Sequence, residues 1–140
     1  MRLLIADHDR GRAKAVSEAC TGRGHLVEIA PHGASALELA LERVPEAVIC
    51  PIDLAVIDGV RLAEILRGNP RTRTVSFIFL VNDELDAPIS MDSRDATVVA
   101  PWHEADVLDH LDLILERSAR FGEIRSDKEI EGKLAQIPAL

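Results

Sequence analysis

The hydrophobic positions of this chain alternate between two spacings. Short continuous apolar runs, such as residues 3–6 and 77–81, are typical of strands covered on both faces of a sheet. Between them, apolar residues recur every three or four positions, as on the buried stripe of an amphipathic helix. The pattern predicts strands over residues 3–6, 25–30, 47–50, 75–81 and 97–99, and helices over residues 10–21, 33–43, 60–66 and 105–119. Strands alternating with helices predict an α/β fold with a parallel sheet and right-handed crossovers.

One segment breaks the alternation. Between the fourth and fifth predicted strands, where the pattern calls for a helix, residues 82–95 hold five acidic residues and one proline. The large apolar side chains of this segment are only Leu85, Ile89 and Met91. Because so little apolar surface is available for burial, we expect this fourth helix to be short or irregular.

The extent of the pattern sets the domain boundaries. The chain has 140 residues, with no apolar run of transmembrane length and no leader-like N-terminus, which fits a single domain. Beyond about residue 120 charged residues dominate, and no apolar stripe returns until Leu134. We therefore predict one domain over residues 1–120 and a linker over residues 121–140.

Charge and cysteine content narrow the function. A net charge of -8, from 24 acidic and 16 basic residues, gives no general attraction to nucleic-acid phosphates or to anionic membranes, so neither is an expected partner. The only basic cluster, residues 67–73, could meet an acidic partner, but a solvated loop between helix and strand is the expectation. Cys20 and Cys50 fall in a predicted helix and a predicted strand, and we expect both to be reduced and structural in a cytoplasmic protein.

Candidate chemistry lies where the strands end. In open parallel α/β sheets, ligands bind at the carboxyl ends of the strands. Four predicted strands end in the sequences Asp7-His8-Asp9, Pro51-Ile52-Asp53, Val81-Asn82-Asp83 and Ala100-Pro101-Trp102. Any site of this protein is therefore expected to be built from these side chains.

Three parts of the sequence, at or just after predicted strands, resemble the receiver domain of two-component response regulators. The stretch Leu3-Leu4-Ile5-Ala6-Asp7-His8-Asp9 is similar to the family's first strand, which ends in paired acids that hold Mg²⁺. The sequence Ile57-Asp58-Gly59 resembles the loop after the acceptor strand, and Ala100-Pro101 resembles the Lys-Pro after the fifth strand, where a cis peptide bond is common. The resemblance covers residues 1–120. It implies a flavodoxin-like (βα)5 fold, a doubly wound parallel sheet of five strands in the order 2-1-3-4-5.

The same resemblance implies that the phosphorylation chemistry is lost. Counting back from Gly59 places Pro51 where the phosphorylated aspartate belongs, while Val81 and Ala100 replace the switch hydroxyl and the lysine. Asp7 remains of the acidic pair, and His8 replaces its neighbour. Receivers need a carboxylate nucleophile, acids to hold a cation, and a lysine and a hydroxyl to stabilise the phosphoryl group. We therefore predict a pseudo-receiver that is not an enzyme, uses no metal or cofactor, and binds proteins in bacterial two-component signalling.

Two alternatives stay open at the same positions. Asp53, two residues beyond Pro51, is the nearest substitute acceptor, although it lacks the supporting lysine and paired acids. Asp7, His8 and Asp9 could instead ligate a metal together, since carboxylates and imidazole are competent ligands. A plainer interpretation makes Asp9 the cap of the first helix and His8 a polar residue at a strand end.

A candidate interaction surface follows from the irregular segment and the single tryptophan. It comprises Leu85, Ile89, Met91 and Trp102. In the family, phosphorylation moves the switch hydroxyl and a ring on the fifth strand. Val81 and Thr97 stand at those places, so this relay is expected to be broken and binding to be constitutive.

Other proteins, or other domains of the same signalling protein, are the expected partners. Residues 131–140 resemble the opening of the PATAN-type interaction domains that follow some bacterial receivers, which makes the start of a second domain the alternative to a linker. A weak homodimer through the last helix is a further possibility, because Leu108, Leu111 and Leu115 form an apolar stripe. Covering the sheet already requires such a stripe.

Overall fold

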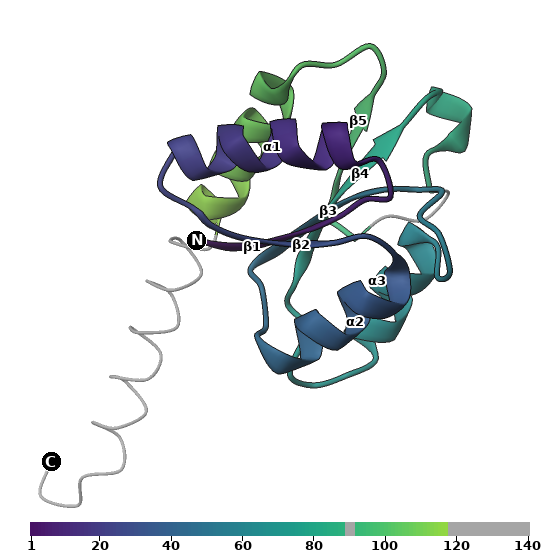
Figure 1. Ribbon diagram of the computed structural model, residues 1–140. Helices are drawn as coiled ribbons and strands as arrows, with labels where there is room; N and C mark the ends of the chain where they lie inside the picture. Colours follow the sequence, from purple (N-terminus) through teal and green to yellow (C-terminus); the bar gives the residue numbers. More distant parts are fainter. Residues whose placement is uncertain (89–91, 118–140) are drawn as a thin grey trace, which may run out of the picture.

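The computed structural model describes residues 1–88 and 92–117, and its centre is a parallel sheet (Figure 1). All adjacent strands of the sheet pair in parallel, in the order β2-β1-β3-β4-β5. The strands are β1 (Arg2–Ala6), β2 (Leu26–Ala30), β3 (Ala47–Pro51), β4 (Ser76–Val81) and β5 (Ala96–Val99). The doubly wound fold and the strand order expected from the sequence are confirmed.

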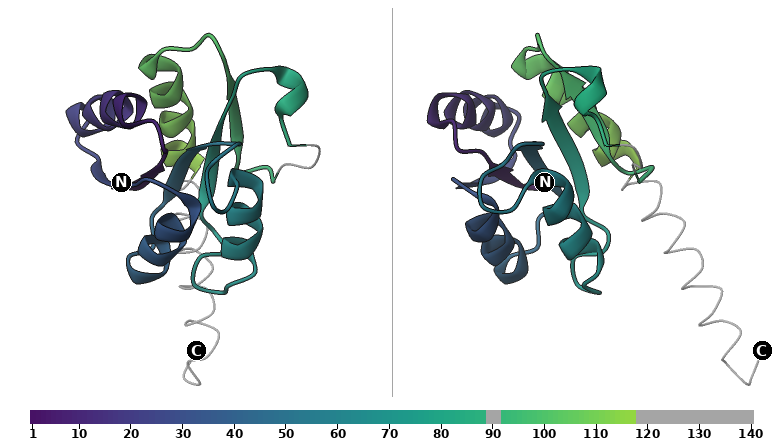
Figure 2. Two further views of the ribbon diagram at one scale, coloured as in Figure 1. Left: turned by 45° about the vertical axis from the view of Figure 1, so that its right-hand side comes forward. Right: turned by 90° about the vertical axis from the view of Figure 1, so that its right-hand side faces the viewer.

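Helices cover both faces of the sheet, as the two views of Figure 2 show. They are α1 (Arg10–Gly22), α2 (Gly33–Glu42), α3 (Gly59–Arg67) and a final helix over residues 104–117. The helix α1 and the final helix lie on one face, and α2 and α3 lie on the other (Figure 1). Each helix begins or ends within one or two residues of the position that the sequence pattern predicts, as far as the described residues extend.

The central strands supply both hydrophobic cores. Along β4, Phe77 and Phe79 pack with the α2 and α3 side, whereas Ile78 and Leu80 pack with α1 and the final helix. Successive side chains of a strand point to opposite faces, so a strand that is covered twice has to be apolar throughout. This requirement explains why β3 and β4 are almost entirely apolar in the sequence, with every residue buried and Ser76 at the start of β4 as the polar exception.

Among its described residues, the connection between β4 and β5 contains one short 3₁₀ helix and no α-helix. This helix, η1 (Glu84–Asp86), begins at Asp83, whose side chain accepts a hydrogen bond from the backbone N–H of Leu85 at 3.0 Å. The expected short or irregular fourth helix is thus seen in residues 82–88 and 92–95. Ile89 and Met91, and the predicted linker over residues 121–140 with its possible PATAN-type start, lie outside the described residues.

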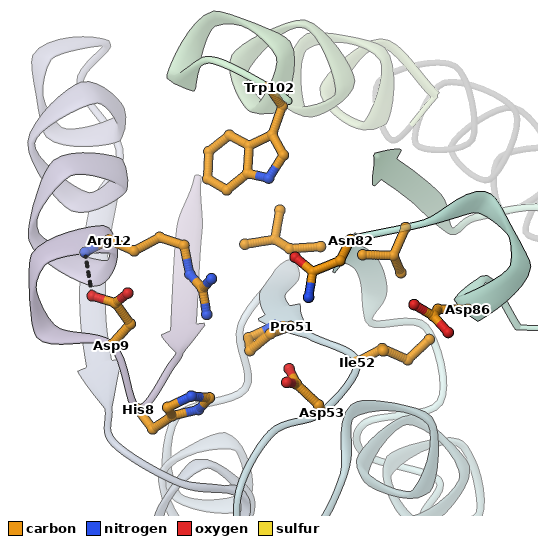
Figure 3. Close-up of a pocket in the computed structure, with 11 residues that line it drawn as sticks. His8, Asp9, Arg12, Pro51, Ile52, Asp53, Asn82, Asp86 and Trp102 are labelled. Atoms are coloured by element: carbon orange, nitrogen blue, oxygen red, sulfur yellow. Dashed lines mark hydrogen bonds between the residues drawn. The ribbon is translucent and has the colours of Figure 1, made fainter. Parts of the chain in front are cut away.

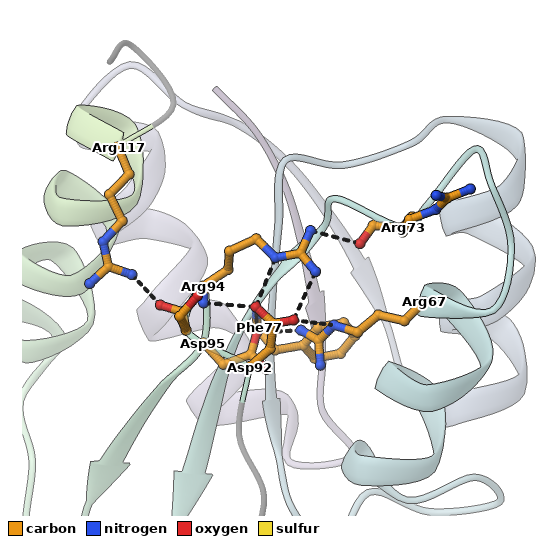
Figure 4. A network of polar contacts seen from close by, with 8 residues as sticks. Arg67, Arg73, Phe77, Asp92, Arg94, Asp95 and Arg117 are labelled. Atoms are coloured by element: carbon orange, nitrogen blue, oxygen red, sulfur yellow. Dashed lines mark hydrogen bonds and ion pairs between the residues drawn. The ribbon is translucent and has the colours of Figure 1, made fainter. Parts of the chain in front are cut away.

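An ionic network holds the end of this connection against the domain (Figure 4). Arg67, the last residue of α3, pairs with Asp95 and lies over the ring of Phe77, with its guanidinium carbon 5.5 Å from the ring centroid. Asp95 also accepts a hydrogen bond from the backbone N–H of Phe77 at 2.9 Å. Nearby, Arg94 donates to both carboxylate oxygens of Asp92 at 2.8 and 2.9 Å. The prediction of a solvated basic loop was therefore wrong for Arg67, because it pairs with a buried carboxylate.

Candidate functional site

A hollow of about 260 Å³ opens at the edge of the sheet where β1, β3 and β4 end (Figure 3). The loop after β1, the end of β3, the end of β4 and the start of the final helix all contribute side chains to it. The lining residues are His8, Asp9, Arg12, Pro51, Ile52, Asp53, Leu80, Val81, Asn82, Asp86 and Trp102. The structure therefore brings together most of the strand-end residues that the sequence singles out.

Asp7 and Arg12 form the strongest polar contact near this hollow. Arg12 Nε lies 2.5 Å from Asp7 Oδ2, and Arg12 Nη2 lies 2.8 Å from Asp7 Oδ1, so the guanidinium binds both carboxylate oxygens. The Asp7 side chain is 1% exposed and that of Arg12 is 30% exposed. The hydrogen bonds to Asp7 raise the pKa of Arg12, against the opposing effect of burial. The negative charge of Asp7 is thus balanced by a cation of the chain itself, the Arg12 guanidinium.

The local fold explains how Arg12 reaches Asp7. Arg12 is the third residue of α1, and helical side chains tilt toward the N-terminus of their helix, here toward the end of β1. Asp9 caps the same helix by accepting the backbone N–H of Arg12 at 3.0 Å, as predicted. This hydrogen bond lowers the pKa of Asp9. Asp7 Oδ1 in turn accepts the backbone N–H of Asp9 at 2.9 Å, which fixes the turn between strand and helix.

The structure does not gather Asp7, His8 and Asp9 around a common point. Asp7 is buried against Arg12, whereas His8 and Asp9 are exposed. Within residues 1–88 and 92–117, no three carboxylate, imidazole or thiol side chains are grouped so that they could hold a metal ion. The metal-site alternative is therefore not favoured by the arrangement of its own residues.

Pro51 is the last residue of β3 and is buried. It pairs with Leu80 of β4, and the next amide N–H, that of Ile52, donates to the Leu80 carbonyl at 3.1 Å. Successive N–H groups of a strand point to opposite neighbours, so the donor that proline lacks would face β1. The pairing of β1 with β3 ends at Ile5 and Ile49, before that point. Proline is compatible with this central strand because it stands at the strand end, where its missing donor lies beyond the last pair with β1 and the pairing with β4 does not need it.

The Asp58-Gly59 pair fixes the loop after β3. The Asp58 carboxylate caps α3 by accepting the backbone N–H of Arg61 at 2.8 Å. Gly59 donates its backbone N–H to the Ile52 carbonyl at 3.1 Å, and a Cβ on Gly59 would lie 2.9 Å from the carbonyl oxygen of Pro51. The start of α3 can approach the end of β3 this closely only at a glycine. The spacing from Gly59 to Pro51 is therefore a structural requirement of this loop.

At the ends of β4 and β5, the residues at positions 81 and 100 have no ionisable side chain. Val81 ends β4 and is 2% exposed, and Ala100 donates its backbone N–H to the Val81 carbonyl at 2.9 Å. The peptide bond between Ala100 and Pro101 is cis. The methyl groups of valine and alanine leave this side of the hollow without a hydroxyl or an ammonium group.

Arg12 and Asp86 contribute to the hollow and were not predicted as site residues, whereas Asn82 belongs to one of the strand-end sequences singled out from the sequence. Arg12 could have been found from its position three residues after the helix cap Asp9 and five after Asp7. Asn82 could be expected at the hollow because it directly follows β4, and the carboxyl ends of parallel strands meet at one edge of the sheet. Asp86 could not have been placed, since it depends on the course of an irregular connection. Asp53, the alternative acceptor, does line the hollow, and its charge helps to raise the pKa of Arg12 (Figure 3).

Trp102 and Leu85 occupy different environments. Trp102 is half-buried, packs against the core on the α1 side of the sheet and lines the hollow, so it is neither fully wedged nor fully exposed. Leu85, on η1, is 91% exposed. On the final helix, Leu108 and Leu111 are buried in the sheet core, and of the predicted dimer stripe only Leu115 is exposed. Of the stripe considered for a homodimer, Leu108 and Leu111 thus cover the sheet, as the alternative interpretation expected, and Leu115 alone is available on the surface.

The two cysteines are buried and free, as predicted for structural residues. Burial raises the pKa of the Cys20 thiol to about 11, and burial also raises the pKa of Cys50 far above its ordinary value. Both thiols are thus protonated at neutral pH and are poor nucleophiles. Among the described residues, no helix is long and apolar enough to cross a bilayer.

A doubly wound sheet with a hollow at its carboxyl edge defines a flavodoxin-like domain, and comparisons with known proteins narrow the class. The chain is 33% identical over 137 residues to the transcriptional regulatory protein AfsQ1 of Streptomyces coelicolor, which covers 90% of this chain and 59% of that protein. It is 30% identical over 68 residues to the response regulator MprA of a Mycobacterium species, covering 49% of this chain and 30% of that protein. The chain thus spans less than two thirds of each of these relatives. No protein-family model matches the sequence.

Solved structures agree with these relatives. A putative response regulator from Chloroflexus aurantiacus superposes with a TM-score of 0.72 at 27% identity, covering 82% of this chain and 97% of that one. The chemotaxis response regulator CheY4 of Vibrio cholerae has the same fold, with a TM-score of 0.72 at 18% identity over 81% of this chain and 97% of that one. Together, the relatives and the structural neighbours support a two-component response-regulator receiver domain.

Proposed function

We propose that this domain is a pseudo-receiver, which transmits a signal by binding other proteins and does not accept a phosphoryl group. The observation that carries the proposal is Pro51, which occupies the buried end of β3 that faces the hollow. A proline side chain offers no oxygen for phosphorylation. The close packing of Gly59 on Pro51 supports this placement, because the Asp58-Gly59 register cannot slide relative to β3.

The surroundings of Pro51 support the same conclusion. Transfer of a phosphoryl group requires stabilisation of its developing charge by cations and hydrogen-bond donors. Val81 and Ala100 offer neither, and the Arg12 guanidinium is already bound to both oxygens of Asp7. Asp53 lies at the hollow as a carboxylate without these supporting groups.

The proposed partner surface lies at the rim of the hollow, around Leu85 and Trp102. A leucine that is 91% exposed on a short 3₁₀ helix contributes nothing to the core, whereas it suits the centre of a protein interface. Asp83, Glu84 and Asp86 surround it with negative charge, which favours a partner with basic residues around an apolar anchor. Ile89 and Met91 remain sequence-based candidates for the same surface. The partner would be a protein, or another domain of the same cytoplasmic signalling protein, in a bacterial two-component pathway.

The acceptor question is tested by incubation with acetyl phosphate and Mg²⁺ followed by intact mass measurement. We expect the mass to stay unchanged, whereas a receiver with a competent aspartate, run in parallel, gains one phosphoryl group. A phosphoryl adduct on this domain would contradict the proposal. If the adduct disappeared in Asp53→Asn, the acceptor would be the alternative carboxylate at the hollow.

The partner surface is tested by affinity capture with Leu85→Asp as the variant. Leu26→Asp is the matched control, since Leu26 is also a strongly exposed leucine, at 67%, but lies on the edge strand β2. We expect partners captured by the unmodified domain to be lost with Leu85→Asp and retained with Leu26→Asp. Loss with Leu26→Asp alone would place the interface on β2 and contradict the proposed surface.

A further inference from the structure

The receiver family's Mg²⁺ is held by carboxylates at the end of the first strand and at the acceptor position, and the corresponding residues here do not fit that ion. Mg²⁺ prefers six oxygen ligands in octahedral geometry. Of the corresponding side chains, His8 carries nitrogen, Pro51 has no side-chain ligand, and Asp7 is the one carboxylate left. The charge of Asp7, whose side chain is 1% exposed, must then be balanced by another group.

The geometry points to Arg12 as the built-in replacement for the divalent cation, an inference that rests on the proposed function and deepens it. The guanidinium binds both oxygens of Asp7, through Nε at 2.5 Å and Nη2 at 2.8 Å. Asp7 Oδ1 accepts a further hydrogen bond from the backbone N–H of Asp9 at 2.9 Å. The oxygen atoms that would coordinate a metal are therefore occupied by donors from the chain itself.

The chemistry of arginine suits this role better than that of lysine. A guanidinium stays charged at every physiological pH, and its planar fork matches a carboxylate through two parallel hydrogen bonds. Arg12 is also held at its backbone, because its N–H donates to the helix cap Asp9 at 3.0 Å. The backbone of Arg12 thus contacts Asp9, and its side chain contacts Asp7. An incoming Mg²⁺ would have to break these hydrogen bonds and meet a positive charge.

Arg12 also changes what the hollow can do. In a receiver that uses Mg²⁺, the state of the site depends on an ion that comes and goes with the surrounding concentration. Here the cation is the side chain of an α1 residue, so the ion pair of Arg12 with Asp7 links the first turn of α1 to the end of β1. The charge of Asp7 is thereby balanced without a divalent cation.

The test is the response of the thermal unfolding midpoint to millimolar MgCl2, with NaCl matched for ionic strength. Four forms of the 140-residue chain are compared: the unmodified protein, His8→Asp, His8→Asp with Arg12→Gln, and His8→Asp with Arg10→Gln. His8→Asp restores the second acid next to Asp7. Arg10 is the matched control, since it is an exposed arginine of the same helix turn. A ligand that binds only the folded state raises the midpoint.

We expect Mg²⁺ to leave the midpoint of the unmodified protein, of His8→Asp and of the Arg10 control unchanged, and to raise it by several degrees in the variant that lacks Arg12. A rise in the unmodified protein or in His8→Asp would overturn the inference, because Arg12 would then not be keeping the ion out. No rise in the Arg12 variant would overturn it equally. If that variant did not fold, His8→Asp with Arg12→Met would take its place, since methionine removes both the charge and the donors while keeping a long unbranched side chain.

This result is independent of the phosphorylation test. A protein that responds to Mg²⁺ but gains no mass with acetyl phosphate would refute the role of Arg12 and leave the pseudo-receiver function standing. A protein that gains mass would refute the function itself, whatever its response to Mg²⁺.

Discussion

The carboxylate of Asp95, immediately before β5, forms an ion pair with the guanidinium of Arg67 at the end of α3. The Asp95 side chain is 1% exposed and also accepts the backbone N–H of Phe77 at the start of the neighbouring strand. One buried carboxylate thus connects α3, β4 and the beginning of β5. This pair stabilises the end of a connection that has no regular helix among its described residues.

Neutralising Asp95 is expected to destabilise the domain. Removing one partner of a buried ion pair leaves the other charge uncompensated, which typically costs about 3–5 kcal/mol. Because Arg67 is partly exposed, at 23%, we expect Asp95→Asn to lower the free energy of unfolding by about 3 kcal/mol, the low end of that range. Urea unfolding measures this. Asp109→Asn, an exposed aspartate on the final helix, is the control, and equal losses in the two variants would contradict the prediction.

Val56 is predicted to be a strained position. Its φ is 73°, in the left-handed region that a β-branched residue rarely adopts, and its side chain is 76% exposed. Such a conformation costs on the order of 1–3 kcal/mol. Val56→Gly relieves the strain and loses little packing. Glycine also increases the conformational entropy of the unfolded chain, so we expect the free energy of unfolding, measured with urea, to rise by a net value of about 1 kcal/mol. Val60→Gly, inside α3, should instead lower stability, and a loss in both variants would exclude strain at Val56.

Gly33 is expected to tolerate no side chain. A Cβ there would lie 2.2 Å from the carbonyl oxygen of Ile57, in the loop after β3. Gly33→Ala should therefore force the start of α2 away from this loop and cost about 1–3 kcal/mol of unfolding free energy. At Gly22, near the end of α1, an added Cβ would have no neighbouring atom within 4 Å, so Gly22→Ala should be neutral or stabilising. Similar effects of the two substitutions would contradict the packing argument.

Acid is expected to weaken the contact between Asp92 and Arg94. Hydrogen bonds from the Arg94 side chain, and then from its backbone N–H, hold the pKa of Asp92 well below its ordinary value of 3.8. A carboxyl with a depressed folded pKa contributes stability that is full above the unfolded pKa and is lost as the pH falls through the folded pKa. The difference in unfolding free energy between the unmodified protein and Asp92→Asn should thus be constant near neutral pH and shrink below 3.8. Urea titrations over that range measure it, and a difference independent of pH would disprove it.

Much of this molecule could be predicted from its apolar periodicity, and the reasons are visible in the structure. The runs that became β3 and β4 are apolar because helices cover both faces, and Asp9 and Asp58 cap helices where the pattern begins. The contact of Arg12 with Asp7 was not predicted, because a side chain that reaches back across a helix start leaves no periodic signal. The same holds for Arg67, whose carboxylate partner lies 28 positions away in the sequence.

The position of Pro51 has a consequence for how this domain could change over time. The missing N–H of the proline would face β1 beyond the last pair, Ile5 with Ile49, whereas the pairing of Pro51 with Leu80 of β4 does not use it. An aspartate at that position could keep the pairing with β4. Such a substitution would not by itself supply receiver chemistry, because Val81, Ala100 and His8 would remain and Arg12 would still bind Asp7. On the proposed function, the block to phosphorylation lies in side chains at the carboxyl edge of the sheet, while the sheet itself has the strand order 2-1-3-4-5 of a flavodoxin-like domain.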